Sequence, residues 1–429
     1  MGITIKSSYV KTATNGINDC LKRSSAKLNF KKYRYRIPDR KKRIFVIILS
    51  IILYFVFLPF TFIVGKKKIR KEFIKNILII RNDGIGDFIL SLPALQLIRR
   101  IFPQTRITLF TGHWQTELAV CSRLFDEIIE FGDNEKDYFL HPQRTKYLFF
   151  DMLKHIPFLR KKNFDIAIDM RGDFRNRIIL WLSGIKYRLS FDIGGMEFLL
   201  TQQIPYREGI HEVEHFLDLV NPFFHPVSTQ TKEFNLFIPD SDKMKVNIFL
   251  KNRDINLKEH YLIIVHPISR WPVKEWSKIN FARLCDKLLS NINIKIILIG
   301  SKEDLFSIRM ISKMMEITPI VAAGEFNLIQ TAYLISRANL FIGNDAAPMH
   351  IAAFFGIPVI ALFGPTDPAI FGPYGEGHTV FRKFNIEKNH KGWSFQTNPN
   401  KFCMDKISVD EVFNCVKQYL NKSNIKNEQ

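Results

Sequence analysis

An acidic residue beside a pair of glycines is the first candidate for chemistry in this sequence. An apolar run at 77–80 leads into Arg81-Asn82-Asp83-Gly84-Ile85-Gly86-Asp87, and an apolar, helix-like segment follows. Glycines at 84 and 86 allow a substrate to approach the backbone, and a carboxylate in such a cleft can accept a proton from a hydroxyl group. Asp87 is also suited to cap the helix, so both interpretations stay open from the pattern alone.

The same loop is a poor match to a dinucleotide site. Ile89 replaces the third glycine of the G-x-G-x-x-G pattern, and the carboxylate of Asp87 would repel a pyrophosphate group at the helix N-terminus. An NAD-dependent oxidoreductase is therefore disfavoured.

Two later loops have the composition of a diphosphate site. One reads Gly343-Asn344-Asp345-Ala346-Ala347-Pro348-Met349-His350, and the segment 356–368 ends in Gly364-Pro365-Thr366-Asp367-Pro368. Their small residues allow a diphosphate to reach backbone N–H groups at a helix N-terminus. Asp345 could instead be a helix cap and His350 a core histidine. Arg270 and Lys274 could neutralise phosphate, although loop cations are usually solvated.

The sequence offers little for a metal ion or a disulfide. Asp240-Ser241-Asp242 matches the DxD pattern of metal-dependent sugar transferases, but its place after Pro239 is typical of the start of a linker helix. The 11 histidines show no zinc-ligand spacing. Five cysteines without a CxxC pair exclude a disulfide scaffold and suit a reducing cytosol. We therefore expect neither a metal nor another cofactor.

Alternating strand-like and helix-length segments must position these residues. The strand-like runs cover 77–80, 107–110, 128–131, 166–169, 261–265, 294–299, 340–342 and 358–363. Their apolar character is typical of strands buried on both faces of a parallel sheet. We predict two doubly wound α/β domains, at 76–240 and 258–405, with a C-terminal helix and tail at 406–429. Ligands of such sheets bind beyond the carboxyl ends of the strands, where the loops described above lie.

The net charge of +21 is concentrated before the first domain. Residues 1–75 contain 19 basic and 3 acidic side chains, so an evenly basic, nucleic-acid-binding body is disfavoured. Segment 44–64 has 21 residues without a charge, enough for a helix to cross a bilayer. It lies between a basic tail (1–43), which we expect to be mostly disordered, and a basic linker (65–75).

Basic residues on both sides of segment 44–64 favour keeping both flanks in the cytoplasm. We therefore expect a re-entrant or interfacial helix that contacts anionic lipids, with a true span as the alternative.

The motifs together resemble glycosyltransferase family 9, the lipopolysaccharide heptosyltransferases. The opening of the family is matched by 81–87 with Leu92-Pro93-Ala94-Leu95. Later blocks follow in the family order: Asp169-Met170-Arg171-Gly172, His266-Pro267 with Lys274-Glu275-Trp276, Gly343-Asn344-Asp345 with Met349-His350, and Phe363-Gly364-Pro365-Thr366-Asp367-Pro368. The resemblance covers roughly residues 76–420. Typical members lack the basic, apolar N-terminal extension.

This resemblance implies a GT-B fold, in which two Rossmann-like domains face a cleft, and an inverting transfer that needs no metal. Asp87 is implied to be the catalytic base, beside the glycine loop of Gly84 and Gly86. The implied donor-binding residues are Lys274, Asp345, Ala346, Ala347, His350, Thr366, Asp367 and Glu303. Arg171 and Arg175 are implied acceptor contacts, because phosphorylated inner-core sugars are anionic.

The implied function is transfer of a heptose from ADP-heptose to a lipopolysaccharide core or related glycolipid. The expected location is the cytoplasmic face of the bacterial inner membrane, with attachment through 44–64 and no nucleic-acid partner. Another nucleotide sugar, a nucleotide-sugar epimerase of the same fold, and a non-catalytic membrane scaffold are the alternatives. The membrane segment argues against the epimerase, and the presence of both Asp87 and Lys274 argues against the scaffold.

Overall fold

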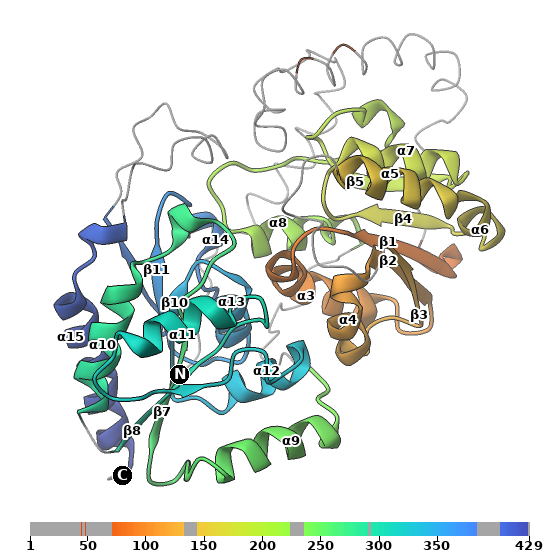
Figure 1. The fold of residues 1–429 in the computed structure, drawn as a ribbon. Coiled ribbons are helices and arrows are strands. Elements are labelled where there is room, and N and C mark those ends of the chain that lie inside the picture. Colours follow the sequence, from red (N-terminus) through yellow and green to blue (C-terminus); the bar gives the residue numbers. More distant parts are fainter. Residues whose placement is uncertain are drawn as a thin grey trace.

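The computed structural model describes residues 44, 48, 71–132, 144–223, 236–290, 293–383 and 404–427. In this part of the chain two lobes, each built on a six-stranded parallel sheet, stand next to each other (Figure 1). The predicted α/β class with two doubly wound domains is confirmed.

The first sheet has the strand order β3-β2-β1-β4-β5-β6. Its strands are β1 (Asn76–Arg81), β2 (Arg106–Gly112), β3 (Glu127–Phe131), β4 (Ile166–Asp169), β5 (Tyr187–Phe191) and β6 (Gln202–Ile204). The order reverses between β1 and β4, so the loops after these two strands leave the sheet side by side. Ile80 lies opposite Asp169 in the register, which brings the Asp87 loop next to the segment that begins at Met170.

The second sheet repeats this order as β12-β11-β10-β7-β8-β9. Its strands are β7 (Tyr261–His266), β8 (Ile294–Leu298), β9 (Ile320–Val321), β10 (Leu340–Asn344), β11 (Val359–Phe363) and β12 (Thr379–Arg382). Here the reversal lies between β7 and β10, where His266 is opposite Gly343. The loops that carry Lys274 and Asp345 therefore start from adjacent strand ends.

Helices cover both faces of each sheet because the strands are apolar on both faces. In the first lobe these are α3 (Ile85–Ile101), α4 (Thr116–Ser122), α5 (Arg144–Lys154), α6 (Ile156–Lys161), α7 (Phe174–Leu182) and α8 (Glu212–Asp218). In the second they are α10 (Lys278–Leu289), α11 (Leu305–Lys313), α12 (Leu328–Ser336), α13 (Ala347–Phe354), α14 (Pro368–Phe371) and α15 (Val409–Asn427). The short 3-10 helices are η2 (Lys71–Phe73), η3 (His113–Gln115), η4 (Glu197–Leu199), η5 (Asn221–Phe223), η6 (Pro272–Lys274) and η8 (Met404–Lys406).

One apolar cluster runs through the facing layers of both lobes. Ile77 and Ile79 of β1 belong to it, while Leu78 and Ile80 pack on the opposite face with α5, α6 and α7, as the twofold alternation of a strand requires. The cluster continues through α3 into α13, and these two helices pack against each other. The lobes are thus joined by buried apolar surface at the level of the strand ends.

The linker between the lobes is helical, as predicted from the sequence after Pro239. Helix α9 (Asp240–Lys251) begins at that proline and packs on α12 of the second lobe (Figure 1). The domain boundaries themselves stay predictions.

The apolar segment 44–64 lies outside the described residues, apart from Ile44 and Ile48, which are helical and exposed. Among the helices that the structure describes, none has the length and apolarity needed to cross a membrane. Attachment through this segment therefore stays a prediction.

Candidate active site between the two lobes

Asp87 lies in the first turn of α3, directly beyond the carboxyl end of β1. Its Oδ2 accepts a hydrogen bond from the backbone N–H of Gly84 at 3.1 Å, so the capping interpretation is confirmed. The side chain is partly exposed, and its charge acts on Arg270 and His350 of the second lobe. A cap through one carboxylate oxygen is compatible with proton acceptance by the carboxylate, because the group has two oxygens.

The two glycines of this loop serve different contacts. A Cβ at Gly84 would fall 2.8 Å from Oδ2 of Asp87, so glycine is needed there for the cap. A Cβ at Gly86 would fall 3.1 Å from Cδ2 of His350 and 3.6 Å from Cα of Ala347. Gly86 therefore gives room to helix α13 of the other lobe, where the sequence had suggested room for a substrate.

Lys274 is the centre of a buried polar group in the second lobe. Its Nζ lies 2.7 Å from Oδ2 of Asp345, and the hydroxyl of Thr366 donates to the same oxygen at 2.6 Å. Lys274, Asp345 and Thr366 are each less than 10% exposed, so Lys274 is not one of the solvated loop cations that form the usual alternative. The group joins the ends of β7, β10 and β11.

The N-terminus of α13 stands beside this buried group. Ala346 is the N-cap residue, no side chain caps the helix, and Pro348 occupies the first turn. Uncapped backbone N–H groups at a helix N-terminus attract anions. Together with Lys274, this arrangement can stabilise negative charge at the carboxyl end of the second sheet.

Two buried histidines border the same strand ends. Burial lowers the pKa of both His266 and His350 to about 4, so each imidazole is neutral at pH 7. Within the described part of the chain, Nδ1 of each ring has no hydrogen-bond partner. The ring of His350 faces the start of α3.

Arg171 and Arg175, the implied acceptor contacts, are held by one carboxylate. Arg175 donates to both oxygens of Asp173 at 2.9 and 2.6 Å, and Nε of Arg171 lies 3.6 Å from Oδ2 of Asp173. These guanidinium groups hold the pKa of the Asp173 carboxyl well below its usual value, against the effect of burial. Arg171 also donates to the backbone carbonyl of Asn82 at 3.2 Å, which fixes it beside the Asp87 loop.

The remaining implied donor residues are Asp367 and Glu303. Asp367 caps α14 by accepting from the N–H of Ala369 at 3.1 Å and lies 3.6 Å from Nη1 of Arg382. Glu303 is exposed in the turn after β8. The roles of these two residues in donor binding stay predictions.

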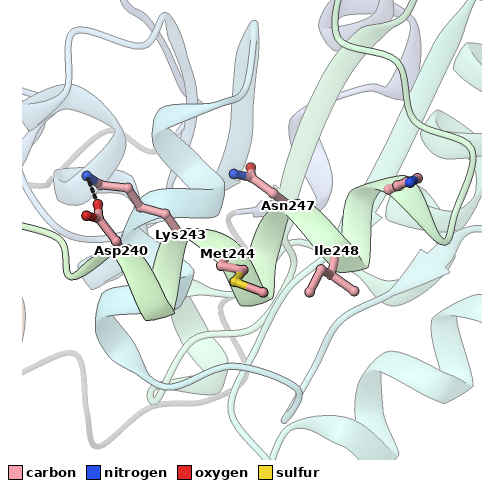
Figure 2. Close-up of a pocket in the computed structure, with 6 residues that line it drawn as sticks. Asp240, Lys243, Met244, Asn247 and Ile248 are labelled. Atoms are coloured by element: carbon pink, nitrogen blue, oxygen red, sulfur yellow. Dashed lines mark hydrogen bonds and ion pairs between the residues drawn. The ribbon is translucent and has the colours of Figure 1, made fainter.

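The Asp240-Ser241-Asp242 motif lies on the surface of α9. Asp240 pairs with Lys243 at 2.9 Å, and Asp242 accepts from Nε2 of Gln330 at 2.7 Å. Figure 2 shows the shallow pocket along this helix, lined by Asp240, Lys243, Met244, Asn247, Ile248 and Lys251. No cluster of three or more possible metal ligands occurs among the described residues.

Hydrogen bonds beside the site connect the two lobes through residues that the sequence analysis did not identify. His211 Nε2 donates to the carbonyl of Gly372 at 3.0 Å, and the hydroxyl of Tyr374 donates to Glu214 at 2.7 Å. The pairs are about 160 residues apart in sequence, so no local pattern signals them. A small cavity between α3 and α13, lined in part by Leu90, His350 and Tyr374, lies in the same region.

Comparisons with known proteins agree with this architecture. The model of glycosyltransferase family 9 (heptosyltransferase) matches residues 152–398. A lipopolysaccharide core heptosyltransferase of Haemophilus influenzae is 25% identical over 80% of this chain and 96% of its own length. Lipopolysaccharide heptosyltransferase 3 of Escherichia coli is 25% identical over 71% of this chain and 86% of its own length.

Solved structures show the same fold. The crystal structure of a family 9 glycosyl transferase from Veillonella parvula has a TM-score of 0.71 at 22% identity, covering 81% of this chain and 98% of that one. ADP-heptose lipopolysaccharide heptosyltransferase II of E. coli has a TM-score of 0.62 at 20% identity, with coverage of 81% and 99%.

Proposed function

The chain belongs to glycosyltransferase family 9, and from this premise we propose that it transfers a heptose from ADP-heptose to a lipopolysaccharide core or related glycolipid, with inversion and without a metal ion. The names of the relatives in H. influenzae and E. coli support heptose as the sugar and the lipopolysaccharide core as the acceptor.

One observation carries the proposed chemistry. The two strand-order reversals face each other, so that the start of α3 with Asp87 meets the start of α13 with His350, and Lys274 is buried beside the N-terminus of α13. A base on one lobe and positive potential on the other are what direct displacement at an anomeric carbon requires.

In the proposed reaction Asp87 accepts the proton of the acceptor hydroxyl, and the oxygen of that hydroxyl forms a bond to the anomeric carbon. The bond from that carbon to the diphosphate oxygen breaks on the opposite face, which inverts the configuration. Lys274 and the N–H groups at Ala346 and Ala347 stabilise the charge of the departing diphosphate. Arg171 and Arg175 attract the anionic acceptor to the first lobe, and segment 44–64 keeps the enzyme at the inner membrane where that glycolipid lies.

The test is a panel of nucleotide sugars with the purified full-length protein. We expect ADP-heptose to raise the melting temperature, because a ligand at 100 times its Kd stabilises the native state by about 2.7 kcal/mol. It should also label a detergent-dispersed lipopolysaccharide acceptor. A shift with a different nucleotide sugar would overturn heptose, and isomerisation of the nucleotide sugar without acceptor would favour the epimerase.

A further inference from the structure

Arg81, the last residue of β1, is a fully buried arginine that the proposed chemistry does not use. Its side chain has 0% exposure. A buried guanidinium is costly unless it is paired and hydrogen-bonded, because the charge loses its hydration. The groups that contact the Arg81 guanidinium therefore indicate its role.

The guanidinium of Arg81 contacts four separate pieces of the first lobe. Nη1 lies 3.1 Å from the Asp83 carboxylate and donates to the backbone carbonyl of Met170 at 3.3 Å. Nη2 donates to the backbone carbonyl of Asp87, and the group stacks over the ring of Phe216 in α8 at 4.3 Å. One side chain thus joins β1, the loop after β4, α8 and the first turn of α3.

We propose that Arg81 is a positioning residue for the catalytic turn, the segment 82–88 that carries Asp87. It fixes the backbone of Asp87, and thereby the carboxylate, relative to the loop after β4 that begins at Met170. The planar guanidinium presents donors in fixed directions and can hold both carbonyls and Asp83 at once, whereas the ammonium of a lysine is a point charge on a flexible stem. This inference rests on the proposed role of Asp87.

Two further hydrogen bonds hold the backbone of this turn in place. The carbonyl of Asp83 accepts hydrogen bonds from Trp114 Nε1 and Gln115 Nε2, each at 2.7 Å. These bonds hold the turn from the side of β2, and Arg81 holds it from the side of β4 and α8. A small displacement of a catalytic group has a large effect on turnover, so loss of one anchor should reduce kcat more than substrate binding.

Arg177 provides a matched control. It is also fully buried, and it donates to the carbonyls of Gly195, Phe191 and Ile193, which are remote in sequence from the catalytic turn. Replacing either arginine by lysine keeps the charge and removes the multiple fixed donors. Arg81→Lys therefore loses hydrogen bonds to the backbone of Asp87 and Met170, whereas Arg177→Lys loses hydrogen bonds to the backbone of 191–195.

The experiment compares Arg81→Lys and Arg177→Lys in the full-length protein with ADP-heptose and detergent-dispersed acceptor. We expect Arg81→Lys to lower kcat about 10- to 100-fold with both KM values within about twofold of wild type. Amide exchange should accelerate in the peptide 82–88 only in this variant. Arg177→Lys should lower the melting temperature and leave kcat of the folded enzyme near wild type.

Wild-type kcat in Arg81→Lys, or an equal fall of kcat in both variants, would overturn the inference. If Arg81→Lys does not fold, Asp83→Asn replaces it, because it keeps the side-chain shape and weakens the hold on the guanidinium. The same split, a lower kcat with unchanged KM, is then required. Asp87→Asn, measured in parallel, separates the proposed base from the proposed positioning residue. If Asp87→Asn keeps wild-type turnover, the proposed base is wrong. If Asp87→Asn loses turnover and Arg81→Lys has wild-type kinetics, only the positioning role of Arg81 is refuted.

Discussion

A single carboxylate in the first turn of a helix both caps the helix and is offered as the base. We predict that Asp87→Asn lowers turnover by about 10²–10⁴, the range for loss of a general base, with donor affinity unchanged. The amide oxygen can still accept the hydrogen bond from Gly84, so the cap and the fold should persist. Radiolabelled sugar transfer and the donor-induced melting shift measure the two effects. Wild-type transfer would remove Asp87 from the mechanism.

Lys274 forms a buried ion pair with Asp345 and is also the proposed cation for the donor diphosphate. Lys274→Ala leaves Asp345 buried without its cation, so we expect a loss of about 3–5 kcal/mol in the free energy of unfolding. The donor-induced melting shift should also fall, because the cation for the diphosphate is gone. Urea titrations with and without ADP-heptose measure both effects.

The proposed use of lysine in place of a divalent ion also has a direct test. We predict that wild-type turnover survives EDTA, because Lys274 and backbone N–H groups supply the positive potential. Loss of activity in EDTA that Mg²⁺ or Mn²⁺ restores would return the Asp240-Ser241-Asp242 motif to consideration as a metal site.

The two buried histidines predict how stability depends on pH. Histidines of the unfolded chain titrate near pH 6.5, whereas those at 266 and 350 titrate at about 4 when folded. Between these values the unfolded state binds more protons, so the free energy of unfolding should fall as the pH is lowered from about 6.5 to about 4. Urea unfolding at several pH values measures this slope. His350→Gln should make this slope smaller, and an unchanged slope in that variant would contradict the assignment.

At the scale of elements, the contact between α3 and α13 decides how the lobes meet. Gly86→Ala places a Cβ about 3.1 Å from Cδ2 of His350, a tight contact that the ring must relieve by shifting by a few tenths of an ångström. Overpacking of this kind costs about 1–3 kcal/mol, so we expect the free energy of unfolding to fall by that amount. Urea titration measures this loss.

Gly84→Ala is the contrasting variant, because its Cβ would meet Asp87 within the first lobe and not α13. It should lower transfer activity, because the added Cβ displaces the Asp87 carboxylate from its cap. An unchanged free energy of unfolding in Gly86→Ala would show that the contact between α3 and α13 tolerates the added methyl group.

At the scale of the whole molecule, the charge at the N-terminus predicts where the enzyme works. We expect a variant without residues 1–72, which carry 18 of the 62 basic side chains, to turn over detergent-dispersed acceptor and to work poorly on acceptor in vesicles. Flotation with anionic vesicles and transfer assays in both formats measure this. Equal rates in the two formats would mean that the segment contributes nothing to acceptor access.

The orientation of segment 44–64 is tested separately. A cysteine placed at Ser8 should resist an impermeant thiol reagent on intact spheroplasts if both flanks are cytoplasmic. Labelling at this position would show that the tail is outside and that the segment spans the bilayer.

Sequence alone determined the parts of the fold that depend on local pattern. Continuous apolar runs identified eight strands of the two sheets, because strands buried on both faces need apolar residues at every position. Strands β5, β6, β9 and β12 were not predicted, because they are short or contain polar residues such as Gln202 and Arg188. Helix α9 was predictable because Pro239 and the acidic residues after it form a local start signal.

Tertiary structure decided which of the candidate residues act together. The pairing of Lys274 with Asp345, the meeting of Gly86 with His350 and the hydrogen bond of Tyr374 to Glu214 each join residues that are between 71 and 264 positions apart. The burial of Arg81 at a strand end was equally invisible, because an arginine after an apolar run is usually solvent-exposed. Spacing along a chain predicts contacts within a turn of helix or across a hairpin, whereas the approach of two lobes depends on how their complete cores pack.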